Sequence, residues 1–221
     1  MHKSITLIAA VEKIPHGASI MIGGFMGVGS PHRLIGELVR QGRKNLTVIS
    51  NDTARPGVGV GRLIDARAIQ RLITSHIGTN PETQRQMIAG EIEVELSPQG
   101  TLAERIRAAG YGLGGVLTPT GVGTTVADGK REIEIDGKTF LLALPINADF
   151  ALIAAHRADY LCNLDYSLTA RNFNPIMAMA GATVIAEAVE IVPVGVIPPD
   201  AVITPAVLVD YLLEKEKVNG R

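Results

Sequence analysis

The sequence contains a single cysteine and no tryptophan. Cys162 cannot form a disulfide within the chain, which favours a reducing compartment over an oxidising one. Cysteine and histidine residues do not cluster with the spacing of metal ligands, so the sequence predicts no metal site. We therefore expect Cys162 to pack in the interior of the protein.

The chain also has almost no net charge and no long apolar run. The 21 basic residues nearly balance the 22 acidic ones, so nothing favours a polyanionic partner such as a nucleic acid. No apolar run approaches the roughly 20 residues that span a bilayer. The N-terminal apolar stretch is short, is interrupted by Glu12 and Lys13, and lacks the pattern of a signal peptide. We expect a cytoplasmic protein that binds no membrane.

Apolar residues make up 46% of the 221-residue chain, enough for a large core of Ile, Val, Leu and Ala. Short β-branched runs end in polar or glycine-rich segments, and amphipathic segments follow them. This alternation predicts an α/β fold with an open, mostly parallel sheet and helices on both faces. Because no low-complexity linker or repeat interrupts it, we expect a single domain over residues 1–221. The expected strands are residues 18–22, 46–50, 69–75, 92–97, 150–158 and 182–192.

Prolines and capping residues predict where several helices begin. Pro31 is expected at the first position of a helix that Ser30 caps, and Pro81 is expected to open another short helix. Thr101 and Glu104 have the spacing of a capping box, which predicts a helix start near residue 101.

The remaining segments give a less regular pattern. Helices are expected at residues 4–13 and 205–217, and a hairpin turning at Asp136 and Gly137 predicts a small antiparallel excursion. Residues 110–125 are too rich in glycine, threonine and proline for a regular element, and a long ordered loop of this kind is usually functional. A polar segment is expected around residues 163–174.

Polar loops follow four of the expected parallel strands. Because ligands bind outside the carboxyl ends of such strands, we expect these loops to meet and form a site. Their polar groups are mostly neutral donors, namely glycine N–H groups and the amides of Asn51, Asn80 and Gln99. Neutral donors suit a carbonyl that gains negative charge during acyl transfer. The four loops are Gly23 to Ser30, Asn51 to Thr53, His76 to Pro81 and Pro98 to Thr101.

The glycine-rich loop does not fit the common phosphate-binding patterns. A dinucleotide fingerprint requires a third glycine three residues after the second, but His32 stands there after Gly27 and Gly29. A P-loop would require a Gly-Lys-Ser/Thr sequence, which does not follow. The alternative is a tight strand-to-helix turn without a ligand. Likewise, Asn51 and Gln99 could be ordinary turn or cap residues.

The sequence also lacks an evident nucleophile. The five histidines are scattered, and none stands with a serine, cysteine or acid in a triad pattern. Glu91, Glu93 and Glu95 alternate with apolar residues, which is typical of the polar side of a strand rather than of a catalytic pair.

The residues that open and follow the glycine-rich loop resemble the alpha chain of the family I CoA-transferases, the 3-oxoacid CoA-transferases, and most closely the bacterial acetate/acetoacetate (butyrate-acetoacetate) type. The signature segment, residues 16–31, reads HGASIMIGGFMGVGSP, and only His16 departs from the usual Asp or Asn. Further typical segments are ISNDT, SHIGTNPETQRQMIAGEIEVELSPQGTLAERIRAAGYGLGGVLTPTGVGT, ADFALIAAHRAD and ARNFNPIMAMAG, and together they cover nearly the whole chain.

This resemblance implies the three-layer α/β/α fold of CoA-transferase and NagB-like proteins, and transfer of CoA from an acyl-CoA to a free carboxylate. The family's nucleophile is a glutamate of a beta subunit, within a Ser-Glu-Asn-Gly motif that this chain lacks. It forms an acyl-glutamyl anhydride and then a glutamyl-CoA thioester. The resemblance further implies an alpha2beta2 heterotetramer, coenzyme A as a substrate, and no permanently bound cofactor.

The resemblance also implies roles for individual residues. Asn51 and Gln99 are expected to support catalysis by hydrogen-bonding reacting carbonyls or orienting the partner's glutamate. The loop expected to face CoA and the acyl group comprises Gly23, Gly24, Phe25, Met26, Gly27, Val28 and Gly29.

Two other functional classes remain open on the sequence alone. One is a non-catalytic structural or binding subunit of the same complex, and the other is a stand-alone enzyme on a related sheet, such as a sugar-phosphate isomerase. The acyl group is also open, because a dicarboxylate such as succinate calls for a nearby cation, whereas acetate and butyrate need a small apolar wall. Arg55 and Arg171 cannot be placed from the sequence.

Overall fold

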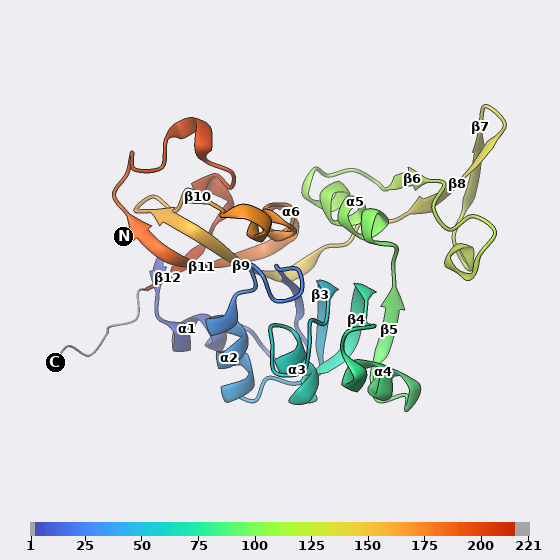
Figure 1. Cartoon of the computed structure of the whole chain (residues 1–221). Coiled ribbons are helices and arrows are strands. Elements are labelled where there is room, and N and C mark those ends of the chain that lie inside the picture. The colour runs from blue at the N-terminus through green and yellow to red at the C-terminus, as the bar shows by residue number, and fades with distance from the viewer. Residues whose placement is uncertain (1–2, 215–221) are drawn as a thin grey trace.

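The computed structural model describes residues 3–214. Within this range, nine strands form one sheet in the order β1-β12-β11-β9-β2-β3-β4-β5, with β10 beside β9 (Figure 1). All the pairs along this order are parallel, and only β10 is antiparallel to its neighbour. The strands are β1 (Ser4–Ile5), β2 (Ser19–Ile22), β3 (Leu46–Asp52), β4 (Ile69–His76), β5 (Glu93–Leu96), β9 (Ala148–Asp159), β10 (Leu164–Asp165), β11 (Gly181–Val192) and β12 (Tyr211–Leu213).

Helices cover both faces of this sheet, as the sequence predicts. In Figure 1 the first four helices lie on one side and the last two on the other. The α-helices are α1 (Leu7–Glu12), α2 (His32–Arg40), α3 (Gly61–Asp65), α4 (Pro81–Ile88), α5 (Gln99–Gly110) and α6 (Asn174–Ala180). The 3-10 turns are η1 (Thr125–Ala127), η2 (Leu168–Arg171), η3 (Pro199–Ala201) and η4 (Ala206–Leu208).

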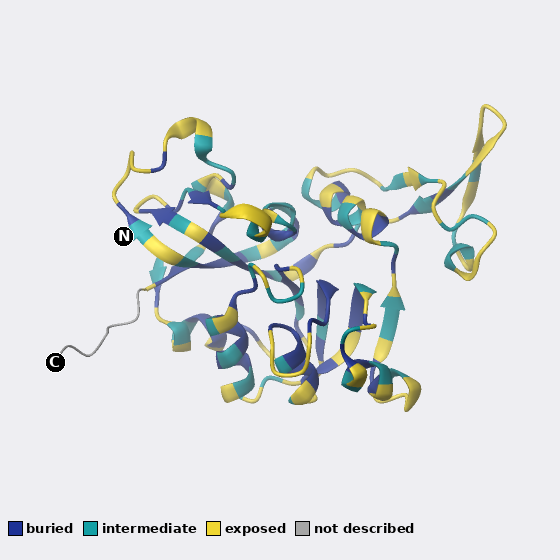
Figure 2. Cartoon of the chain, viewed as in Figure 1, coloured by how far each residue is buried: buried dark blue, intermediate teal, exposed yellow. Residues whose placement is uncertain are grey.

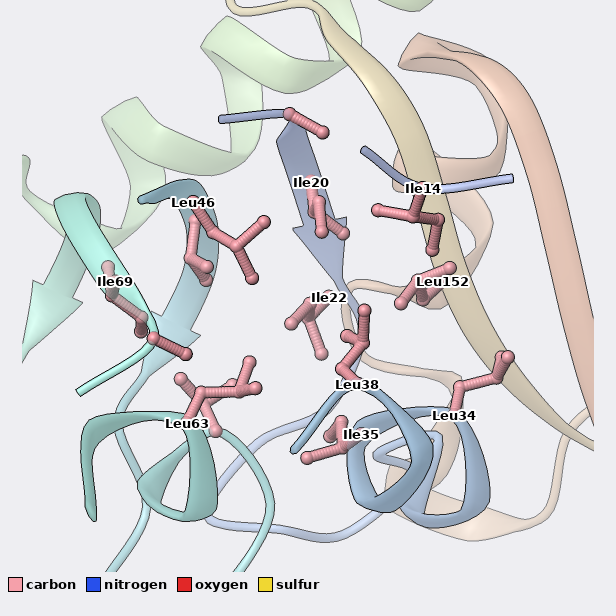
Figure 3. Close-up of a cluster of buried hydrophobic side chains, with 14 of the residues drawn as sticks. Ile14, Ile20, Ile22, Leu34, Ile35, Leu38, Leu46, Leu63, Ile69 and Leu152 are labelled. Carbon is pink, nitrogen blue, oxygen red and sulfur yellow. The ribbon is translucent and has the colours of Figure 1, made fainter. Parts of the chain in front are cut away.

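Alternating side chains of the strands divide the core into two layers. Ile20 and Ile22 of β2 pack against α2 and α3 in the first layer, together with Leu38 and Leu63 (Figure 3). Met21, between them in sequence, packs in the second layer with residues of α5 and α6. Because successive side chains of a strand point to opposite faces, β2 fills both layers only by being apolar at consecutive positions.

The hairpin predicted at Asp136 and Gly137 is confirmed. Both residues have positive φ, as a tight two-residue hairpin turn requires. The hairpin belongs to a three-stranded antiparallel sheet in the order β6-β8-β7, which projects away from the large sheet and is more exposed than it (Figures 1 and 2). Its strands are β6 (Val116–Thr118), β7 (Glu132–Ile135) and β8 (Lys138–Ala143).

Two predicted helices are wrong. Residues 4–13 begin as strand β1 and become helical only at Leu7. Residues 205–214 form the turn η4 and strand β12 instead of a helix, and residues 215–217 lie outside the described part of the chain. Strand β12 runs between β1 and β11, so pairing with segments far away in sequence overrides its local helical pattern.

The two predicted caps are also wrong. Helix α5 begins at Gln99 after Pro98, and Thr101 lies buried within its first turn. Helix α2 begins at His32, and no side-chain cap bond comes from its N-cap residue, Pro31. Its cap is supplied by Glu187 of β11, whose carboxylate accepts hydrogen bonds from the N–H groups of Arg33 and Leu34, each at 3.1 Å. A carboxylate there is stabilised by the positive end of the helix dipole.

We expect Glu187 to make the stability of the fold depend on pH. Burial raises its pKa to about 7 from an ordinary 4.5, although the N–H groups of Leu34 and Arg33 act in the opposite direction. Between these values the folded protein holds a proton that the unfolded chain has released, so stability falls as pH rises. The loss approaches about 3 kcal/mol, at 1.36 kcal/mol for each pKa unit.

We expect Glu187→Gln to remove most of this pH dependence, because its side chain does not ionise. Urea unfolding of the wild type and the variant at pH 5 and pH 8 measures the effect. Glu190→Gln, on the same strand but exposed, is the matched control. Equal pH dependence in the wild type and Glu187→Gln would show that Glu187 is not responsible.

Candidate functional site

The glycine-rich loop after β2 lies where the strand order reverses. Strands β3, β4 and β5 follow one another on one side of β2, whereas β9, β11 and β12 lie on the other side. Such a switch point opens a crevice at the carboxyl ends of the strands. The loop contains a tight turn in which Phe25 and Val28 exchange backbone hydrogen bonds of 3.0 and 2.8 Å. Met26 and Gly27, in the middle, both have positive φ.

The loop is held from behind by Asn172 and Asn174, which precede and begin α6. The Asn174 amide nitrogen donates to the carbonyl of Gly29 at 2.9 Å, and its oxygen accepts from the N–H of Ala154 at 3.0 Å. Asn172 accepts from the N–H of Gly24 at 3.2 Å. Sequence reasoning missed both asparagines, although they lie in the ARNFNP segment typical of the family.

Gly23 is required by its close approach to Asn174. A Cβ atom on Gly23 would lie 1.8 Å from the side-chain oxygen of Asn174. Gly29 is required for a different reason, because its φ is +73° and a Cβ would lie 2.9 Å from backbone atoms of Ala170. The glycines therefore fit the loop closely against its support, which accounts for part of the glycine content without a ligand.

Asp52 ties the loop to the end of β3. One carboxylate oxygen accepts from the N–H of Met26 at 2.9 Å and from the Asn51 amide nitrogen at 2.7 Å. The other accepts from the N–H of Ala54 at 2.7 Å. The side chain is buried, with 5% of its residue surface exposed. Asp52 therefore fixes both the turn at Met26 and the direction of the Asn51 amide.

The structure brings Asn51 and Gln99 together. The Gln99 amide nitrogen donates to the side-chain oxygen of Asn51 at 2.9 Å, and Ser75 Oγ donates to the same oxygen at 3.2 Å. Asn51 is buried, with 2% exposed, whereas Gln99 is exposed at the start of α5. Gln99 is thus the member of this pair that a ligand can reach most easily.

The predicted meeting of four loops is confirmed by the contacts between them. Thr79, from the loop after β4, donates through Oγ1 to the carbonyl of Ala54 at 2.8 Å and contacts Met26 Sδ at 3.5 Å. Asn80 does not reach the site, because it is fully buried and caps α4 by accepting from the N–H groups of Glu82 and Thr83. Its role is structural.

Two hollows share the side chains of Phe25 and Gln99. The first, which we call the amide pocket, has a volume of about 290 Å³ and also contains Met26, Asn51, Asp52, Ser75 and His76. The second, the α5–α6 groove, has a volume of about 340 Å³ and lies between the first turns of α5 and the residues that begin α6. Arg55 and Arg171 are not among the residues that line either hollow.

Among the described residues, neither a metal-binding cluster nor the cysteine contributes to this site. Between residues 3 and 214, His, Cys, Asp and Glu form no group of three or more that could hold a metal ion. Cys162 is buried as expected, and burial raises the pKa of its thiol, so its thiolate is disfavoured. In the same part of the chain, no helix is both long enough and apolar enough to cross a membrane.

Comparison with known proteins agrees with this geometry. The family model for coenzyme A transferase matches residues 5–215. The alpha chain of acetate CoA-transferase from Escherichia coli K12 is 50% identical over 97% of this chain and 98% of its own length. The alpha chain of the acetoacetyl-CoA:acetate/butyrate CoA transferase of Clostridium acetobutylicum is 50% identical over 90% of this chain and 91% of its own.

A solved acyl-CoA transferase from Escherichia coli O157:H7, a thioester complex with CoA, superposes with a TM-score of 0.84. It is 22% identical and covers 95% of this chain, which spans 46% of its length, so the likeness shows the fold. The fold, the site at its switch point and the matched family model define one class: the chain belongs to the coenzyme A transferase family. Within that family it corresponds to an alpha chain, because these two relatives are alpha chains matched over at least nine tenths of their length.

Proposed function

We propose that this chain, as a single domain over residues 1–221, is the alpha subunit of a cytoplasmic CoA-transferase. The enzyme moves CoA from acetoacetyl-CoA, butyryl-CoA or succinyl-CoA to a short-chain carboxylate. A beta subunit supplies the nucleophilic glutamate, and two copies of each subunit form the complex. Relatives are named as alpha chains of transferases for acetate or butyrate and as A chains of succinyl-CoA:3-ketoacid coenzyme A transferases, and these names support a partner subunit and this range of substrates.

The observation that carries this proposal is the chain of hydrogen bonds from Gln99 through Asn51 and Asp52 to the N–H of Met26. In it a neutral amide lies beside the loop and is held in a fixed direction. When a carboxylate attacks a thioester, the carbonyl oxygen gains negative charge before the thiolate leaves. A preorganised neutral donor stabilises that charge more than it stabilises the ground-state carbonyl.

The burial of each residue suggests how the roles divide. One hydrogen of the Gln99 amide is used for Asn51, and the second can donate to the carbonyl of the acyl-CoA. Asn51 and Asp52, which are buried, hold that amide in position. The loop from Gly23 to Gly29 lets the CoA thioester approach the backbone on the other side of the amide pocket.

Replacing Gln99 with alanine tests this assignment. We expect kcat of the assembled enzyme to fall at least tenfold, since loss of one such donor costs about 2.7–4 kcal/mol in comparable sites. The chain is co-expressed with its beta subunit, and exchange of CoA between acetoacetyl-CoA and acetate or butyrate is followed. Gln41→Ala, at the C-cap of α2, is the matched control, because the side chain of Gln41 bonds to Ile8, Glu37 and Arg43, which do not line either hollow.

Each outcome of this experiment discriminates between functions. Unimpaired turnover by Gln99→Ala would remove Gln99 from the mechanism and favour a purely structural role for this chain. A wild-type complex that exchanges CoA between no pair of substrates would contradict the transferase proposal itself.

A further inference from the structure

The α5–α6 groove begins at the proposed reaction centre and leads away from it. Gln99 and Phe25 line both the amide pocket and this groove, so the two hollows adjoin at those side chains. The groove lies along the contact between α5 and α6, and successive turns of α5 form one of its walls. Its lining includes the apolar residues Phe25, Ala103, Phe173 and Ile176 and the polar residues Gln99, Arg107 and Asn172.

The wall between Ala103, Phe173 and Ile176 is apolar and is fixed by the core behind it. Phe173 is buried, with 6% exposed, and belongs to the second core layer. Ala103 and Ile176 are partly buried and pack against the same layer, so each presents one side to the groove and the other to the core. A rigid apolar wall binds methyl and methylene groups through the area they remove from water, at about 0.8 kcal/mol for each methylene.

The charged residue that lines the groove, Arg107, forms an ion pair with Glu104. Arg107 is the only Lys, Arg, His, Asp or Glu among its lining residues, and it lies two turns from Gln99 along α5. Its Nε donates to both carboxylate oxygens of the exposed Glu104, at 3.0 and 3.2 Å. A second carboxylate on the acyl chain would have to compete with Glu104 for Arg107, and beside Ala103 or Ile176 it would lose water without gaining a polar partner.

We propose that the α5–α6 groove binds the acyl chain of a short monocarboxylic acid, and that Ala103 and Ile176 set its length. This inference rests on the proposed function and narrows its substrate class. Gln99 holds the carbonyl at the mouth of the groove, and the chain extends between the two helices toward Arg107. Dicarboxylic acyl groups are disfavoured, so butyryl and acetoacetyl groups fit better than succinyl.

The test varies the size of the groove in both directions. The alpha and beta subunits are co-expressed, and the complex is given acetoacetyl-CoA with acetate, propionate, butyrate, valerate or succinate, while each acyl-CoA product is quantified. We expect Ala103→Leu to lower the butyrate-to-acetate ratio of kcat/KM about tenfold or more, since one methylene is worth about 10–200-fold in an apolar pocket. Ile176→Ala is expected to raise the valerate-to-butyrate ratio.

The controls separate specificity from damage. Ala109→Leu makes the same change on the same helix, at a half-buried residue that packs against the same core layer but does not line the groove. It is expected to leave the substrate ratios unchanged. If Ala103→Leu fails to assemble, the smaller change Ala103→Val and the cavity variant Ile176→Ala decide the question, each checked by its melting temperature.

The possible failures can be told apart. Active, folded variants at positions 103 and 176 with wild-type substrate ratios would overturn the assignment of the groove and leave the transferase intact. Succinate as the preferred acid of the wild type would overturn the monocarboxylate class. A complex that exchanges CoA with no acid would contradict the proposed function, and this inference would fall with it.

Discussion

Replacement of Gly23 by alanine is expected to destabilise the protein by roughly 3 kcal/mol or more and to abolish CoA transfer. Gly23 does not have a positive φ, so its backbone would accept an alanine and the cost is steric. The new methyl group would overlap the side-chain oxygen of Asn174, which a Cβ would approach to 1.8 Å. Overpacking alone typically costs about 1–3 kcal/mol, and each buried donor left unsatisfied adds a similar amount.

The cost is large because Asn174 has no room to move. It is fully buried, and its amide bonds to Ala154, Gly29 and Ala170 at 2.8–3.0 Å. Moving it frees the N–H of Ala154 and releases the end of the glycine-rich loop. Urea unfolding measures the stability loss, and the exchange assay measures the loss of activity.

A double-mutant cycle identifies the cause. In a background with Asn174→Ala, the clash is gone, so Gly23→Ala should cost much less than it does in the wild type. Gly114→Ala is the matched control, because a Cβ there meets nothing within 4 Å and its φ is not positive. Equal costs in the two backgrounds would show that Asn174 is not what requires a glycine at position 23.

The central strands were predictable because the local pattern of apolar residues agrees with their burial on both faces of the sheet. Residues 18–22 and 46–50 are mostly apolar runs rich in β-branched side chains, and they correspond to β2 and β3. A strand buried on both faces has to be apolar at consecutive positions, so its pattern is visible without any knowledge of its neighbours. The hairpin at Asp136 and Gly137 was predictable for a similar reason, since its turn demands positive φ.

Elements that depend on distant partners were not predictable. Strand β12 has three residues and exists because it pairs with β1 and β11. Helix α6 begins at the end of the expected polar segment, where no helix was predicted, although Pro175 in its first turn was a usable signal. The cap of α2 comes from Glu187, 154 positions along the chain from Arg33. Sequence patterns within a short window cannot reveal contacts of that range.

In the candidate site, too, some residues were predictable from the sequence and others were not. Asn51 and Gln99 were predictable because loops at the carboxyl ends of parallel strands meet, and the structure places their amides 2.9 Å apart. Asp52, the adjacent residue, lies in the same predicted loop, but no sequence pattern indicates what it bonds to. Its three hydrogen bonds depend on the folded positions of Met26, Asn51 and Ala54, so its role becomes visible only in the structure.

Replacement of Asp52 by asparagine is therefore expected to lower kcat at least tenfold, although the residue does not contact the substrate. Asp52 accepts three hydrogen bonds through two oxygens. An asparagine offers one oxygen and one NH₂ group, so in either orientation at least one donor loses its acceptor and faces another donor. A buried donor left unsatisfied costs about 1–3 kcal/mol. The Asn51 amide, and through it Gln99, then loses its fixed direction.

The kinetic signature of this variant distinguishes positioning from binding. If Asp52 acts through Gln99, Asp52→Asn lowers kcat more than it raises KM, and adding it to Gln99→Ala causes little further loss of kcat. Asp65→Asn is the matched control, since Asp65 also accepts a backbone N–H, from Gly57 at 2.7 Å, but is exposed and does not line the amide pocket. Additive losses in the double variant would mean that Asp52 affects catalysis independently of Gln99, because a residue that acts only by orienting an amide has no effect once that amide is gone.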